Sequence, residues 1–130
     1  MLDRLFGNRS PGSDTAGRTP PGQHLTDKLP VLHYGSVPAA DLDTWSFRVF
    51  GQVDAPLAMT WEEFRALPRA QVTVDIHCVT RWSKLDTTWE GVPVRTILDL
   101  AGVRPTATHV LAHCEQGYTT NVPLEVLADD

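Results

Sequence analysis

Two stretches of the chain alternate apolar and polar residues, and this period of two predicts half-buried β-strands. One stretch covers residues 45–51, and the other begins at Val72 and runs through Ile76 to Cys78. Residues 108–114 are apolar almost without interruption, which is typical of a central strand covered on both faces. The pattern therefore predicts that strands dominate the ordered part of the chain.

Other stretches carry apolar residues at helical spacing instead. Thr60 and Glu63 form the sequence signature of a capping box, and Pro68 ends the helix that they begin. Residues 94–101 have an apolar face, and Gly102 is suited to end this second helix.

The remaining connections contain turn-forming or polar residues, and a third helical segment begins at residue 124. Residues 29–38 predict an ordered loop in which Gly35 permits a turn. Further connections are expected at 79–83, at 89–94 (a turn or an edge position) and at 115–123.

Residues 1–24 are rich in Gly, Pro, Ser, Thr and Arg, and such a segment buries too little apolar surface to offset its ordering entropy. We expect a disordered N-terminal arm here, with docking of the arm as the less favoured alternative. Residues 25–130 then form a single domain, because 130 residues leave room for one core.

Composition narrows the function classes. The net charge is −5 and no basic stripe is present, which argues against nucleic-acid binding. No apolar run is long enough to span a membrane, and no export signal is visible at the N-terminus. Two cysteines do not make a disulfide framework, so we expect free thiols in a reducing cytoplasm.

Cys78 is the first candidate for chemistry, because it stands where a strand passes into a polar loop that also holds Arg81 and Trp82. The pairs 77–78 and 113–114 raise the possibility of a zinc site, although adjacent strand residues point to opposite faces. Cys78 could instead be a nucleophile activated by a cation, or a small buried hydrophobe. A fourth interpretation is a soft thiolate ligand for a metal held mainly by an organic cofactor.

Three motifs resemble one known family. The runs His-Cys-Val-Thr-Arg-Trp-Ser at 77–83, Trp-Glu-Gly-Val at 89–92 and Glu-Gln-Gly-Tyr-Thr-Thr-Asn-Val-Pro-Leu at 115–124 are similar to the sulfite-oxidase-like molybdopterin oxidoreductases. They occur in the order expected for that superfamily, and the resemblance runs from about Pro20 to the last residue.

The resemblance implies an α+β fold with a mixed, β-rich, barrel-like core and a few short helices. It also implies a molybdenum–molybdopterin cofactor, with Cys78 as the single protein ligand to molybdenum. His33 and Tyr34 match the loop that contacts the pterin in relatives, and Cys114 matches a further cofactor contact. Arg81 is expected to attract an oxyanion substrate or to hold the cofactor phosphate.

The reaction that the family implies is two-electron oxygen-atom transfer on a small sulfur-containing or oxyanion substrate. The chain has neither a C-x-x-C-H haem motif nor a dinucleotide fingerprint, so we expect electrons to pass through a separate partner. Relatives continue past the position of Asp130, so residues 25–130 are expected to be the N-terminal portion of the domain, truncated at the C-terminus. The alternative function is a non-catalytic remnant that acts only as a folded binding module.

Overall fold

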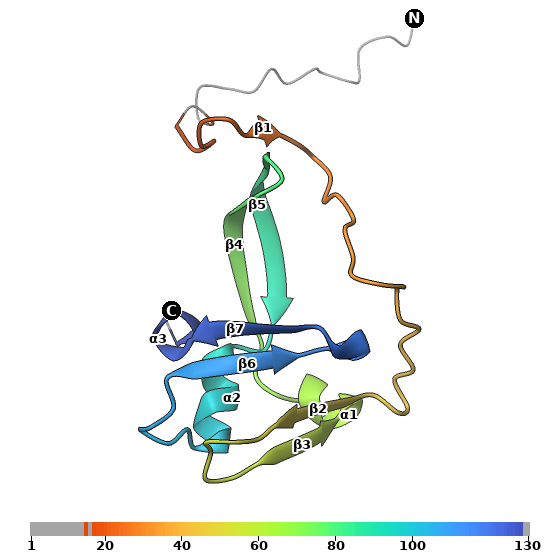
Figure 1. Ribbon diagram of the computed structural model, residues 1–130, viewed down its shortest axis with the longest axis vertical. Helices are drawn as coiled ribbons and strands as arrows, with labels where there is room; N and C mark the ends of the chain where they lie inside the picture. Colours follow the sequence, from red (N-terminus) through yellow and green to blue (C-terminus); the bar gives the residue numbers. More distant parts are fainter. Residues whose placement is uncertain (1–14, 16, 129–130) are drawn as a thin grey trace, which may run out of the picture. The chain divides into compact units, whose positions relative to one another are not determined.

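The computed structural model describes residue 15 and residues 17–128, and Figure 1 labels their helices and strands. Chain contacts divide the protein into two units, one formed by Met1–Val31 with Val72–Trp89 and the other by Leu32–Gln71 with Glu90–Asp130. In chain order the elements are β1 (His24–Leu25), β2 (Ser46–Val49), β3 (Leu57–Thr60), α1 (Trp61–Arg65), β4 (Ala70–His77), β5 (Trp82–Gly91), α2 (Val94–Ala101), β6 (His109–His113), η1 (Glu115–Gly117), β7 (Thr119–Pro123) and α3 (Leu124–Leu127).

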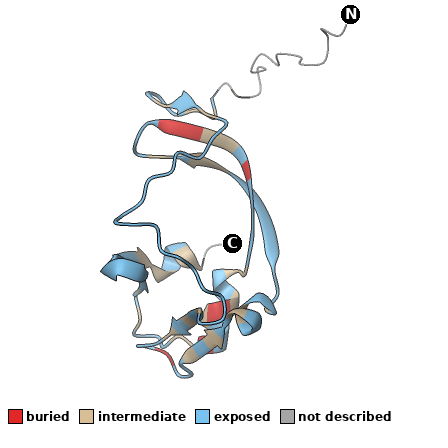
Figure 2. Cartoon of the chain, turned by 90° about the vertical axis from the view of Figure 1, so that its right-hand side faces the viewer, coloured by how far each residue is buried: buried red, intermediate tan, exposed pale blue. Residues whose placement is uncertain are grey.

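The first unit is built on the hairpin of β4 and β5, which forms a three-stranded sheet with β1 in the order β1-β5-β4. Trp82 and Ser83 are buried at the start of β5, and Figure 2 colours part of this hairpin as buried. The sequence predicts a loop over 79–83, but the second strand already begins at Trp82. Burial of the indole explains the difference, since a polar loop would leave it in water.

The N-terminal segment contacts this hairpin. Arg18 donates to both carboxylate oxygens of Asp75, at 2.6 and 3.0 Å, and to Asp86 at 2.6 Å. Residues 17–24 were expected to belong to a disordered arm, and in the structure they contact the hairpin through the ion pairs of Arg18, the side chain of Gln23 and the backbone pairing of β1. Composition does not reveal this docking, because it depends on side chains more than fifty residues apart. Residues 1–14 and 16 lie outside the described part of the chain.

Aromatic side chains organise the first half of the second unit. β2 and β3 pair antiparallel, with Phe47 opposite Met59, and α1 follows β3 directly. The capping box predicted from the sequence is confirmed, since Thr60 accepts from the Glu63 amide and Glu63 accepts from the Thr60 amide. The rings of Trp45, Phe47, Trp61 and Phe64 pack together with centroids 5.0–6.4 Å apart.

The second helix follows the sequence prediction from end to end. α2 covers Val94–Ala101 and buries Ile97 and Ala101, which form part of the small core of this unit in Figure 2. Gly102 has the left-handed conformation (φ 63°), and its amide donates to the Leu98 carbonyl at 3.0 Å. This is the αL helix ending that glycine adopts without steric strain.

β6 differs from its prediction. The apolar run at 108–114 was expected to be a central strand, but within residues 17–128 it pairs only with β7, as an antiparallel ladder from His109↔Pro123 to His113↔Thr119. Leu111 is 52% exposed, so the strand is not covered on both faces. β7 itself lies in a stretch expected to be a loop, because its polar Thr and Asn residues conceal a strand that tertiary pairing stabilises.

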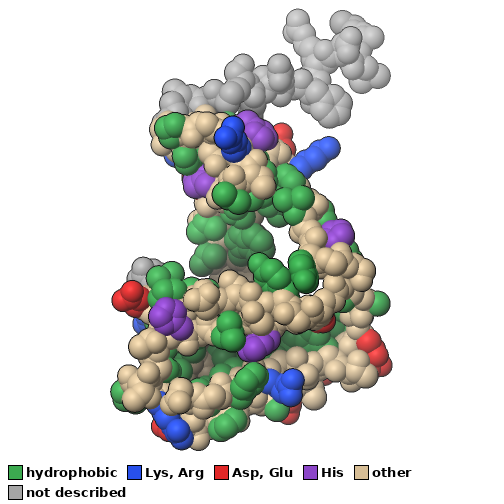
Figure 3. Space-filling view, viewed as in Figure 1, with side chains coloured by type: hydrophobic (Ala, Val, Ile, Leu, Met, Phe, Trp, Pro, Cys, Tyr) green, Lys and Arg blue, Asp and Glu red, His purple; other side chains and the backbone are tan. Residues whose placement is uncertain are grey.

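The α+β class with strands in the majority and a few short helices is confirmed, whereas the expected barrel-like closure is not seen. The described strands form three separate open sheets. Hydrophobic side chains are visible on the β4–β5 hairpin in Figure 3, and Val72, Val74 and Trp89 are the large exposed ones in those strands. No helix in the described part of the chain is long and apolar enough to cross a membrane.

Candidate functional site

Cys78 lies on a tight turn between β4 and β5, which we call the Cys78 turn (residues 78–81). The amide of Cys78 donates to the Trp82 carbonyl at 2.9 Å, and the Arg81 amide donates back to the Cys78 carbonyl at 3.0 Å. Arg81 has a left-handed backbone (φ 69°), the conformation that closes three-residue hairpin loops. A non-glycine residue in that conformation costs roughly 1–2 kcal/mol, so the surrounding hairpin maintains this geometry.

Hydrogen bonds to sulfur set the ionisation of this thiol. The Thr80 hydroxyl donates to Cys78 Sγ at 3.2 Å and lowers the pKa of Cys78 below that of an ordinary thiol. The backbone amides of Thr80 and Val79 lower the pKa further, while partial burial acts in the opposite direction. The net effect favours the thiolate, which is the form that binds metals and attacks electrophiles.

A row of hydrogen-bonded polar side chains contacts the Cys78 turn. Gln23 donates through Nε2 to the Cys78 carbonyl at 3.0 Å, and the buried Ser83 hydroxyl donates to Gln23 Oε1 at 3.2 Å. His77 Nδ1 lies 2.8 Å from Ser83 Oγ. Because the hydroxyl hydrogen of Ser83 already points to Gln23, His77 is the donor in that last bond.

His33, Tyr34 and Cys114 lie together in the second unit, around a hollow of about 540 Å³ that we call the tyrosine pocket. The rings of Tyr34 and Tyr118 pack against each other with centroids 5.3 Å apart. The full lining of the tyrosine pocket is Leu32, His33, Tyr34, Ser36, Pro38, Cys114, Glu115, Gln116 and Tyr118.

Polar contacts within and between the two walls hold the tyrosine pocket in place. Gln116 donates to the Ser36 hydroxyl at 3.0 Å, across eighty residues of sequence. Cys114 Sγ donates to the Tyr118 carbonyl at 3.3 Å, and His33 Nδ1 donates to the Gly35 carbonyl at 2.8 Å. The second ring nitrogen of a neutral His33 is therefore an acceptor.

Gly35 is required where these walls meet. Its backbone is left-handed (φ 70°), and a Cβ at this position would lie 1.7 Å from Gln116 Oε1. The turn predicted at Gly35 is confirmed, and the close approach of Gln116 adds a reason for glycine that the sequence does not reveal.

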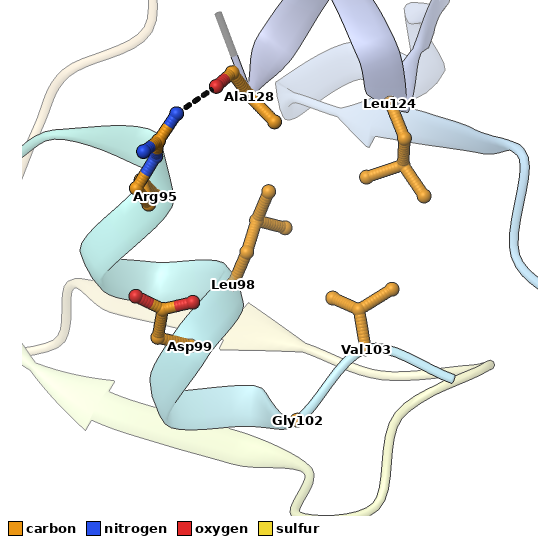
Figure 4. Close-up of a pocket in the computed structure, with 7 residues that line it drawn as sticks. All are labelled: Arg95, Leu98, Asp99, Gly102, Val103, Leu124 and Ala128. Carbon is orange, nitrogen blue, oxygen red and sulfur yellow. Dashed lines mark hydrogen bonds between the residues drawn. The ribbon is translucent and has the colours of Figure 1, made fainter. Parts of the chain in front are cut away.

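A second hollow, of about 590 Å³, lies between α2 and α3 in the same unit (Figure 4). Leu98, Val103 and Leu124 line it with apolar side chains, and Arg95 donates to the Ala128 carbonyl at its edge. None of the residues predicted to form the site lines this hollow.

The predicted site residues thus form two groups, Cys78 and Arg81 on one turn and His33, Tyr34 and Cys114 around one pocket. Thr80, Gln116 and Tyr118 join these groups without having been predicted individually. Thr80 could have been found, because a hydroxyl two residues after a cysteine can reach its sulfur. In the described part of the chain, no three His, Cys, Asp or Glu side chains come together as a metal site.

Comparison with known proteins places this geometry in context. Residues 34–130 match the family described as the oxidoreductase molybdopterin binding domain. The chain is 43% identical over 122 residues to the uncharacterized oxidoreductase YuiH of Bacillus subtilis (strain 168), covering 93% of this chain and 62% of that protein.

A solved structure resembles the fold. The sulfane dehydrogenase SoxCD from Paracoccus pantotrophus superposes with a TM-score of 0.62 at 22% sequence identity, over 75% of this chain and 30% of the solved chain. This likeness supports the fold alone. The chain spans less than two thirds of the length of either relative.

Proposed function

Because the chain belongs to the oxidoreductase molybdopterin binding domain family, we propose that it is part of a molybdenum–molybdopterin enzyme that performs two-electron oxygen-atom transfer. The substrate is a small sulfur-containing molecule or an oxyanion. The name of the solved relative, a sulfane dehydrogenase, supports a sulfur-containing substrate.

The observation that carries this proposal is the Cys78 thiol. It is half-buried at the apex of a hairpin, and donors from Thr80 and Val79 favour its thiolate form. Thiolates are the protein ligands that soft and redox-active metals prefer. A single thiolate suffices when an organic chelate supplies the other ligands, so the donor set of this turn fits the cofactor.

The tyrosine pocket has the composition of a site for the organic part of a cofactor. Its hollow of about 540 Å³ combines two aromatic rings with hydroxyl, imidazole, amide and thiol groups. Cofactor pockets typically pair apolar walls with a few polar groups that set orientation. We assign His33, Tyr34 and Cys114 to binding of the pterin.

Arg81 supplies positive charge next to Cys78. Its side chain is exposed and forms no ion pair with the residues that the structure describes. A guanidinium binds the oxygens of anions in a bidentate manner. We assign Arg81 to attraction of an oxyanion substrate or of the cofactor phosphate.

The bound cofactor supplies the two-electron chemistry. In the oxidative direction the substrate gains an oxygen atom from water and releases two protons and two electrons. The electrons pass to a separate electron-transfer partner. The residues named above bind and orient the cofactor, and Arg81 supplies positive charge beside Cys78.

Metal analysis of the purified full chain, produced in a host that makes the cofactor, tests this proposal. We expect near-stoichiometric molybdenum and a molybdenum–thiolate absorption band, both lost in Cys78→Ser. Thr88→Ser, a conservative change at an exposed position of β5 outside both groups of predicted site residues, is the control and retains molybdenum.

Two results contradict the proposal. One is zinc in place of molybdenum, and the other is molybdenum that Cys78→Ser leaves in place. A protein that only serves as a folded binding module shows no molybdenum band, and its melting temperature does not change when cofactor is supplied.

A further inference from the structure

We propose that residues 18–26, the N-terminal strap, hold the Cys78 turn in the geometry in which its thiol binds metal, with Gln23 as the positioning residue. This inference rests on the proposed function of Cys78 as a metal ligand. The strap precedes residues 34–130, the part of the chain that matches the family.

The backbone of the strap is attached to the turn itself. β1 pairs with β5 in parallel, with His24 opposite Trp82 and Leu25 opposite Ser83. The His24 amide donates to the Arg81 carbonyl at 3.0 Å, and Arg81 is the last residue of the turn. The strap therefore constrains the residue whose left-handed conformation closes the loop.

Gln23 adds a side-chain contact to the residue that carries the thiol. The Cys78 carbonyl accepts from the Arg81 amide at 3.0 Å and from Gln23 Nε2 at 3.0 Å. These two donors occupy both lone pairs of the carbonyl oxygen. The peptide group of Cys78 is thereby held by the turn on one side and by the strap on the other.

Gln23 is itself held in place by Ser83. The Ser83 side chain is fully buried, its hydroxyl donates to Gln23 Oε1, and it accepts from His77. The Gln23 amide donates through its nitrogen to the Cys78 carbonyl and accepts through its oxygen from Ser83, so its orientation is determined. Ser83 is the buried member of this network, and a buried polar group whose hydrogen bonds are satisfied favours a single arrangement.

Arg18 attaches the other end of the strap to the hairpin. Its guanidinium binds Asp75 on β4 and Asp86 on β5, both at 2.6 Å. The strap is therefore fixed to the body of the hairpin by charge, and to the turn by the Gln23 side chain and the His24 amide. Among these attachments, only that of Gln23 contacts Cys78 itself.

The isosteric substitution Gln23→Glu separates positioning from simple attachment. A glutamate retains the acceptor for Ser83 and the volume of the side chain, but it has no donor for the Cys78 carbonyl. Gln23→Leu removes both bonds. Gln71→Leu, at an exposed glutamine of β4, is the matched control.

The first measurement is amide hydrogen exchange in the cofactor-free full chain. We expect the amides of Cys78 and Arg81 to exchange about tenfold faster in both Gln23 variants and at the wild-type rate in Gln71→Leu. The second measurement is molybdenum retention by the loaded protein, where both Gln23 variants lose the metal severalfold faster and shift the thiolate absorption band.

If Gln23 attaches the strap without positioning the turn, Gln23→Glu matches the wild type in amide exchange, metal retention and absorption band. This result overturns the proposal. A urea midpoint equal to that of the wild type verifies that Gln23→Glu is folded. If the wild-type protein takes up no molybdenum, the proposed function fails, while the exchange rates still decide whether Gln23 holds the turn.

Discussion

The Cys78 turn and the tyrosine pocket are built in contrasting ways. The ionisation of the Cys78 thiol and the bonds that close the Cys78 turn come from neighbours within four residues, chiefly Thr80 and Trp82, and Gln23 is a distant residue that adds a bond to the Cys78 carbonyl. The tyrosine pocket joins residues eighty positions apart, through contacts such as that of Gln116 with Ser36. The ionisation of Cys78 is therefore a local property, whereas the tyrosine pocket exists only when distant segments pack.

The largest expected effect is that of Gly35→Ala on the tyrosine pocket, which joins distant segments of the chain. A left-handed alanine and the loss of the Gln116–Ser36 bond together lower the free energy of unfolding by about 2 kcal/mol. Urea unfolding measures this loss. Gly91→Ala is the control and changes stability by no more than about 0.5 kcal/mol, because nothing lies within 4 Å of its Cβ position. Equal losses in both variants contradict the assignment of a special role to Gly35.

Thr80→Val tests whether the Cys78 turn sets the ionisation of its thiol. Loss of the hydroxyl donor raises the pKa of Cys78 toward that of an ordinary thiol, so alkylation by iodoacetamide at neutral pH slows severalfold. The rate is measured against pH in a Cys114→Ser background, which leaves one thiol. Thr120→Val on β7 serves as the control. A pH profile that Thr80→Val does not move shows that the turn does not set the ionisation of the thiol.

Arg18→Met examines how far the hairpin depends on the N-terminal segment. The hydrogen bond from Arg18 lowers the pKa of Asp75 in the folded protein. The Arg18–Asp75 pair therefore contributes its full stability above the pKa of Asp75 in the unfolded chain, about 4. This contribution is lost as pH falls through the lower pKa of Asp75 in the folded protein. We expect Arg18→Met to lower the urea midpoint at pH 7, and this difference from the wild type to shrink in acid.

Arg48→Met, at an exposed arginine of β2, is the control for that pH dependence. Its urea midpoint follows that of the wild type at every pH. A difference between Arg18→Met and the wild type that persists unchanged in acid assigns the effect to packing instead of charge.

The smallest effect is expected at Thr73 and Thr88, whose hydroxyls lie 3.0 Å apart on exposed positions of the hairpin. Thr73→Val lowers the free energy of unfolding by no more than about 0.5 kcal/mol, since water replaces the lost bond and valine suits a strand. A double-mutant cycle with Thr88→Val isolates the coupling. A coupling well above that value shows that this surface contributes more to the hairpin than its exposure indicates.

Elements with a local cause were predicted well. The capping box of Thr60 and Glu63 and the helix that ends at Gly102 both follow from residues within one or two turns of helix, and the structure confirms both. β7 and the start of β5 were missed. The polar threonines of β7 are typical of a loop, and pairing with the preceding strand β6 decides its conformation. Trp82 follows a polar turn, and burial of its side chain decides the start of β5.

The sequence by itself determined the helices, the turn at Gly35, the position of Cys78 at the end of a strand and, through three motifs, the family. Only the tertiary structure decided that Arg18 and Gln23 reach the hairpin and that Tyr34 packs against Tyr118. Hydrogen bonding and steric fit between neighbours act over a few residues, so they can be inferred from the order of residues. Pairing of distant groups depends on which surfaces meet after the chain has folded.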